Sequence, residues 1–204
     1  MMTGSNPIRA PGGAKDSTIT GPVAASIFDA AFNGNLPTVQ ALFNESDGAK
    51  GASILSKRDE NDRTSLHWAC SGSRPEVAEW LLKDGADANA ADDSGWTPLI
   101  IAASVGSAPL VNLLVAHGAD VNRQNETGQT ALHYCASKNR TEVRRCRAAR
   151  RQRDPNSADQ QGQLPIHRAA SLGHLKLVQL LHGVGKYKSF RAWVVRHVES
   201  VDLE

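Results

Sequence analysis

The sequence of 204 residues predicts an all-α solenoid of about five stacked helix-turn-helix units, with no sizeable sheet. Three observations support this fold class. A short element recurs at a period of about 33 residues, a pair of small residues follows each copy, and an apolar segment of helical period comes next. Units of this size cannot bury an apolar face alone, so we expect stacking between neighbours to supply the core.

A five-residue element is repeated four times along the chain. Its copies are RTSLH at 63–67, WTPLI at 96–100, QTALH at 129–133 and QLPIH at 163–167. Threonine at the second position can cap free backbone amides, and proline at the third position begins a helix without losing an amide donor. The element matches the T-P-L-H signature of the ankyrin repeat, and its recurrence in phase predicts an ankyrin-repeat fold.

The residues after each copy predict two helices per unit. The first helix carries two adjacent small residues, which allow its neighbour to approach closely. These pairs are Ala69-Cys70, Ala102-Ala103, Cys135-Ala136 and Ala169-Ala170. An apolar second helix follows, as in residues 77–82 and 110–115, and Gly85 and Gly118 end it in a left-handed conformation. The residues that open the next turn, toward the binding side, are Asp59, Asp92, Asn125 and Asp159.

Other segments complete the predicted domain organisation. Residues 27–34 form a degenerate first unit without the T-P-L-H element, as expected for a terminal capping repeat. We expect a disordered segment rich in glycine, proline, serine and threonine at 1–22, and the ankyrin-repeat domain at 23–182. Residues 183–204 are an off-family tail. Within it, Gly185-Lys186-Tyr187 can be encoded by a splice-donor sequence, which favours intron read-through as the origin of this tail.

An arginine-rich run makes the domain irregular at 144–153. It contains six of the 23 lysines and arginines, and removing these six from the net charge of +2 leaves −4. Three explanations are open: a nucleic-acid or nuclear-import patch, a solvated insert, or translation in a shifted frame. The abrupt loss and recovery of register favours the third, and the lack of interleaved aromatic residues disfavours nucleic-acid binding. Because unpaired arginines cannot replace a buried apolar helix, we expect faster amide exchange at 144–181 than at 64–122.

Composition and motifs argue against several classes of function. Three cysteines without Cys-x-x-Cys spacing disfavour a disulfide framework and a zinc site, and they fit the cytoplasm and nucleus. The repeat histidines occur one per unit, so we expect them to bond the backbone between units rather than to hold a metal. The sequence has no apolar stretch of membrane-helix length, no secretory signal and no nucleotide-binding or hydrolase motif. We expect a monomer that has no enzymatic activity, cofactor or metal and does not bind membranes.

Residues that the repeat itself does not require resemble those of the gankyrin family. They are LHWACS at 66–71, DDSGWTPL at 92–99 and LHYCASKNR at 132–140. The resemblance extends over about residues 27–181. It implies a chaperone for assembly of the 26S proteasome regulatory particle, which binds the C-terminal domain of a proteasomal ATPase subunit through its concave face. Since that family has about seven repeats, the chain would correspond to the N-terminal two-thirds. The alternative is a general ankyrin adaptor of cell-cycle or transcription regulators.

The resemblance also implies which residues bind the partner. In that family a basic residue before the threonine of the second repeat, and the lysine of a Ser-Lys-Asn-Arg segment, meet acidic residues of the ATPase domain. These roles fall on Arg63 and Lys138, which we expect on the exposed concave face. The full predicted set is Arg63, Trp68, Trp96, Tyr134, Lys138 and Arg140. Basic and aromatic side chains on one rigid face are typical of protein-binding hot spots. Packing within the stack is the alternative role for Trp68 and Tyr134.

Overall fold

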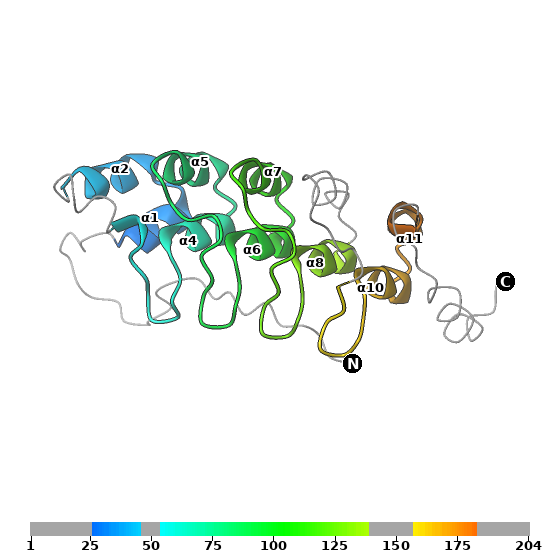
Figure 1. Ribbon diagram of the computed structural model, residues 1–204. Coiled ribbons are helices and arrows are strands. Elements are labelled where there is room, and N and C mark those ends of the chain that lie inside the picture. The colour runs from blue at the N-terminus through cyan, green and yellow to red at the C-terminus, as the bar shows by residue number, and fades with distance from the viewer. Residues whose placement is uncertain (1–25, 46–53, 139–156, 183–204) are drawn as a thin grey trace, which may run out of the picture.

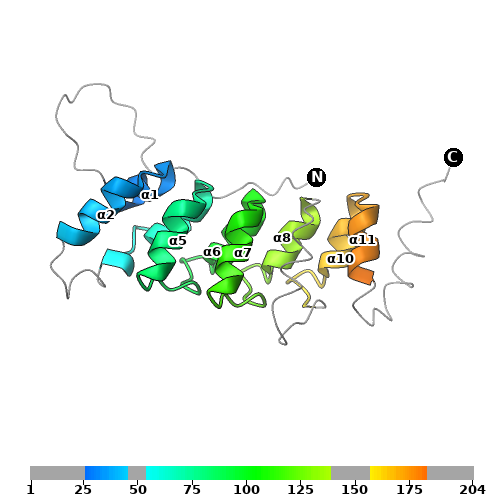
Figure 2. The ribbon, with the colours of Figure 1, turned by 90° about the horizontal axis from the view of Figure 1, so that it is seen from above.

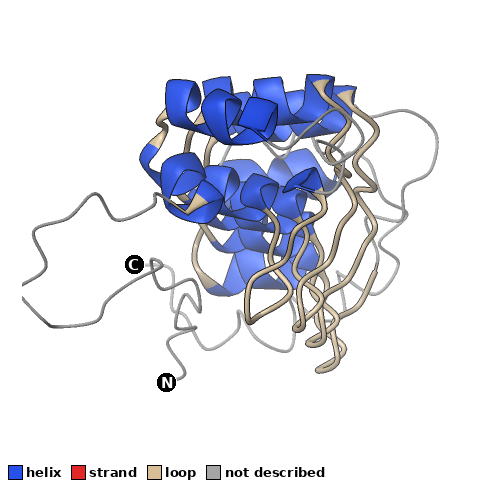
Figure 3. Cartoon of the chain, turned by 90° about the vertical axis from the view of Figure 1, so that its left-hand side faces the viewer, coloured by secondary structure: helices blue, strands red, loops and turns tan. Residues whose placement is uncertain are grey.

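The fold was obtained as a computed structural model, which describes residues 26–45, 54–138 and 157–182. In these ranges the chain consists of helices and loops without a strand, which confirms the predicted all-α solenoid (Figure 3). The predicted disordered segment 1–22, the arginine-rich run 144–153 and the tail 183–204 lie outside the described residues, as does Arg140.

The helices form two layers along the stack. The first helices of successive units are α1 (Ile27–Asn33), α4 (Ser65–Ser71), α6 (Pro98–Val105), α8 (Ala131–Ser137) and α10 (Pro165–Ser171). The second helices are α2 (Leu36–Glu45), α5 (Pro75–Lys83), α7 (Ala108–Ala116) and α11 (Leu175–His182). Figure 1 shows the second helices above the first, and Figure 2 shows them following one another along the stack. Loops 57–64, 90–97, 123–130 and 157–164, here called the finger loops, project to the opposite side (Figure 1).

The predicted helix starts and ends are confirmed. Pro98 and Pro165 each occupy the first position of a helix, and Thr97 Oγ1 accepts a hydrogen bond from the Ile100 amide at 3.4 Å. Gly85 and Gly118 follow α5 and α7 with φ of 98° and 83°, a region that costs glycine little. The second helices therefore end where the sequence predicted.

The core lies between the two layers and between neighbouring units. Leu81 of α5 and Leu110 and Leu114 of α7 are fully buried, as are the predicted small pairs of α4, α6 and α8. A Cβ atom built on Gly72 would lie 2.1 Å from the carbonyl oxygen of Phe32, so the first two units approach too closely for any side chain there. The degenerate unit packs on the array as the predicted terminal repeat, with α1 against α4.

The repeat histidines join consecutive units, as predicted. His67 Nε2 lies 3.1 Å from the carbonyl oxygen of Trp96, and His133 Nε2 lies 3.1 Å from that of Gln163. A carbonyl only accepts, so Nε2 carries the proton and Nδ1 is free to accept. Nδ1 of His67 accordingly accepts from the Thr64 amide at 3.1 Å. Each of these two histidines thus ties the start of its own helix to the next finger loop.

Candidate protein-binding face

The base of every finger loop is closed by an Asp or Asn side chain. Oδ1 of Asp59 accepts from the amides of Asn61 and Arg63, both at 2.9 Å. The same atom of Asp92 accepts from the amides of Ser94 at 3.1 Å and Trp96 at 2.7 Å. Asp159 repeats this pattern with the amides of Gln161 and Gln163, and Asn125 Oδ1 accepts from the Gln129 amide and the Thr127 hydroxyl. These turns hold the finger loops in one conformation and leave the second polar atom of each side chain available.

In three units this second atom bonds to a side chain nine residues further on. Trp68 Nε1 donates to Asp59 Oδ2 at 2.8 Å, and Asn125 Nδ2 donates to Tyr134 Oη at 3.1 Å. In the last described unit, Arg168 Nη2 donates to Asp159 Oδ2 at 2.8 Å. Each bond fastens a finger loop to the first helix of the same unit.

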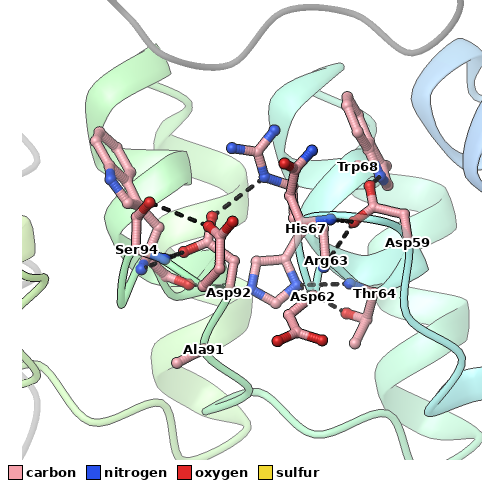
Figure 4. A network of polar contacts seen from close by, with 12 residues as sticks. Asp59, Asp62, Arg63, Thr64, His67, Trp68, Ala91, Asp92 and Ser94 are labelled. Atoms are coloured by element: carbon pink, nitrogen blue, oxygen red, sulfur yellow. Dashed lines mark hydrogen bonds and ion pairs between the residues drawn. The ribbon is translucent and has the colours of Figure 1, made fainter.

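The second finger loop departs from this pattern because the residue nine positions after Asp92 is Ile101, which has no polar group. Arg63 of the preceding unit takes the place of that partner and donates from Nε to Asp92 Oδ2 at 3.1 Å (Figure 4). The side chains of Arg63 and Asp92 are 9% and 0% exposed, respectively. The contact is therefore a buried ion pair between two units.

An aromatic side chain lies beside this ion pair, and further aromatic contacts follow along the array. The guanidinium carbon of Arg63 lies 5.5 Å from the ring centroid of Trp68, within the range of a cation–π interaction. The Trp68 ring in turn meets Phe32 edge to face, with centroids 6.1 Å apart. In the following units Trp96 packs against Tyr134 with centroids 4.8 Å apart. Burial raises the pKa of Tyr134, so its hydroxyl stays protonated at neutral pH.

The structure corrects the prediction for Arg63. We expected its side chain on an exposed face, but it is buried because it supplies the cation that Asp92 lacks within its own unit. Trp68 and Trp96 are also buried, at 4% and 7% exposure, so their visible role is packing. Lys138, directly after α8, is exposed as predicted. Partner binding by the six residues stays a prediction.

Sequence reasoning missed Asp92, which it treated only as a turn former. A signal was present in the sequence. The residues nine positions after the four turn formers are Trp68, Ile101, Tyr134 and Arg168. Only Ile101 among them cannot form a hydrogen bond, so Asp92 needed a partner from elsewhere.

Burial shifts the pKa of two titratable groups in this region. Burial raises the pKa of the Cys70 thiol, which leaves it protonated and poorly nucleophilic. Burial lowers the pKa of His67 to about 4, so its ring is neutral at physiological pH. Within the described ranges, no three His, Cys, Asp or Glu side chains are grouped to hold a metal ion. The described helices also include none with the length and apolar character needed to cross a membrane.

The two helical layers, the finger loops and the histidine bonds between units are those of an ankyrin array. A family model for ankyrin repeats matches residues 27–125 and 101–189, and the chain belongs to the ankyrin-repeat family. Within this family it is gankyrin-like. It is 37% identical over 139 residues to the probable 26S proteasome regulatory subunit p28 of Saccharomyces cerevisiae, which covers 66% of this chain and 60% of that protein.

Two further relatives match shorter segments. The chain is 46% identical over 46 residues to 26S proteasome non-ATPase regulatory subunit 10 of Homo sapiens, or 22% of this chain and 20% of that protein. It is 38% identical over 74 residues to protein phosphatase 1 regulatory subunit 27 of Mus musculus, or 36% of this chain and 44% of that protein. The chain thus spans less than two-thirds of the length of these relatives.

Proposed function

We propose that this protein is a non-catalytic scaffold of the 26S proteasome regulatory particle. More specifically, it would act as an assembly chaperone that binds the C-terminal domain of a proteasomal ATPase subunit through its concave face. The observation that carries the proposal is the 37% identity over 139 residues to a probable proteasome regulatory subunit. We further propose that it works as a monomer in the cytoplasm and nucleus and does not require nucleic acid.

The architecture supports a role in recognition by a rigid surface. Backbone hydrogen bonds join each finger loop to the next, from the Asp93 amide to the Asn61 carbonyl at 3.2 Å and from the Glu126 amide to the Ser94 carbonyl at 3.0 Å. A surface fixed in this way loses little conformational entropy on binding. Lys138 adds an exposed cation that can attract an acidic partner.

The second candidate is a general ankyrin adaptor of cell-cycle or transcription regulators. The identity to a protein phosphatase 1 regulatory subunit supports this possibility, because it shows that the repeat pattern is shared with a protein named for a different partner. Both candidates use the same fold, so only the identity of the bound protein separates them.

Binding measurements with charge reversals test the proposal. The C-terminal domains of the proteasomal ATPase subunits would be titrated against the wild-type chain and the Lys138→Glu variant. We expect at least one domain to bind, and the variant to bind it about tenfold more weakly because a like charge now faces acidic residues. Lys176→Glu is the matched control, since Lys176 is an exposed lysine on the second helix α11.

Two outcomes would contradict this proposal. If none of the ATPase domains binds the wild-type chain, the proteasomal role is wrong, and specific capture of a cell-cycle or transcription regulator would favour the adaptor. If a domain binds but Lys138→Glu and Lys176→Glu have equal affinities, the binding face is not the one proposed.

A further inference from the structure

We infer that Asp92 is a positioning residue for partner binding, which acts by holding the guanidinium of Arg63. This inference rests on the proposed function and on the expectation, implied by the gankyrin resemblance, that Arg63 meets an acidic group of the partner. Asp92 itself would not touch the partner, because its side chain is fully buried.

The contacts of Asp92 suit this role. Its Oδ1 is held by two backbone amides, those of Ser94 and Trp96, so the carboxylate cannot rotate freely. Among the described residues, its Oδ2 accepts a hydrogen bond from Arg63 Nε alone. The Trp68 ring restricts the movement of the guanidinium from another side, because its centroid lies 5.5 Å from the guanidinium carbon. A planar group that is held at Nε has a fixed direction for its two terminal nitrogens.

The terminal nitrogens of Arg63 differ from Nε in their hydrogen bonding. Within residues 26–45, 54–138 and 157–182, Nε is the one guanidinium nitrogen of Arg63 that forms a hydrogen bond. Figure 4 shows Nη1 and Nη2 turned away from the loop that carries Asp92. Two parallel N–H donors match the two oxygens of a carboxylate, which an arginine binds in a forked geometry. A partner glutamate or aspartate fits this site.

The contact between Arg63 and Asp92 has no equivalent between the following described units. At the positions equivalent to Arg63, the following units carry Trp96, Gln129 and Gln163. The second polar atoms of Asp59, Asn125 and Asp159 are taken by side chains of their own units. Because Ile101 cannot bond Asp92, this is the one unit, of those whose finger loops the structure describes, that leaves a carboxylate free to hold an arginine of its neighbour.

Charge and positioning make opposite predictions for the Asp92→Asn variant. Removing a negative charge beside Arg63 raises the local positive potential, so charge alone would strengthen binding of an acidic partner. Loss of the hydrogen-bond acceptor at Nε lets the guanidinium rotate, so the positioning role predicts weaker binding. Asparagine keeps the turn, as Asn125 does at the equivalent place in the next loop.

The test uses the full chain and the ATPase C-terminal domain that binds it most tightly. We expect Asp92→Asn to weaken binding about tenfold, and to have no further effect in a chain that already carries Arg63→Gln. Asp159→Asn is the control, because it breaks an equivalent carboxylate–arginine contact in a distant finger loop and should leave affinity unchanged. Equal or tighter binding by Asp92→Asn would overturn the inference.

A second measurement separates this inference from the proposed function. The Nε–H signal of Arg63 in the NMR spectrum should exchange slowly with water in the wild-type chain and rapidly in Asp92→Asn. If no ATPase domain binds the wild-type chain, the proposed function fails, and the inference about binding fails with it. If a domain binds but the Arg63 signal exchanges equally in both chains, the proposed function stands and the positioning role of Asp92 is wrong.

Discussion

Replacing Arg63 by glutamine should strongly destabilise the array, although the sequence suggested an exposed site. The substitution leaves Asp92 as an unpaired carboxylate whose side chain is 0% exposed. Removing one partner of a buried ion pair costs about 3–5 kcal/mol. Asp92 keeps two hydrogen bonds from backbone amides, so we expect a loss of about 3 kcal/mol in the free energy of unfolding. Glutamine occurs at the equivalent positions of two later units, so the backbone tolerates it.

A double-mutant cycle isolates the contribution of the pair. The four chains are the wild type, Arg63→Gln, Asp92→Asn and the double variant. In the double variant both charges are gone and two amides can bond each other, so its loss of stability should be well below the sum of the single losses. We expect a coupling free energy of about 2 kcal/mol, within the range for contacting residues in one network.

Urea denaturation followed by circular dichroism provides the measurement. The exposed pair of Lys83 and Glu79, with a 2.7 Å contact and side chains 63% and 50% exposed, serves as the comparison and should show little coupling. A coupling below about 0.5 kcal/mol between Arg63 and Asp92 would refute the reasoning. Arg63 would then be as exposed in solution as the sequence had indicated.

Three further substitutions test the packing and the protonation states. His67 has a pKa lowered to about 4, so its stabilising effect is complete above about pH 6.5 and is lost as the pH falls toward 4. The free energy of unfolding should therefore fall by on the order of 3 kcal/mol over this pH range. The fall should be smaller in His67→Gln, and denaturation at several pH values measures it. Ser65→Ala should raise the melting temperature, because the buried Ser65 hydroxyl has no hydrogen-bond partner within the described residues. Gly72→Ala should cost more than Gly85→Ala. The Cβ at position 72 would collide with the backbone carbonyl of Phe32, whereas the Cβ at position 85 meets no atom within 4 Å and is strained only by its left-handed φ of 98°. Equal melting temperatures would contradict this.

The sequence by itself determined the architecture of the array. A T-P-L-H-like element marks the first helices α4, α6, α8 and α10, and glycine marks the end of the second helices at Gly85 and Gly118. These signals are readable because helix caps and left-handed turns depend on residues close together in the chain. The histidine bonds between units were also predictable, because they repeat with the period of the units.

Only the tertiary structure decided the environment of the candidate binding residues. Arg63 lies 29 residues before Asp92, and their pairing depends on a third residue, Ile101, which fails to supply a polar group. The burial of Trp96 likewise depends on Tyr134 of the following unit. No short sequence pattern predicts such contacts. Each involves a residue that differs from the repeat consensus, and the contact forms only when two units are stacked. The physical reason is that a buried carboxylate is stable only when it is paired with a cation, and any neighbouring element in the folded chain can supply that cation.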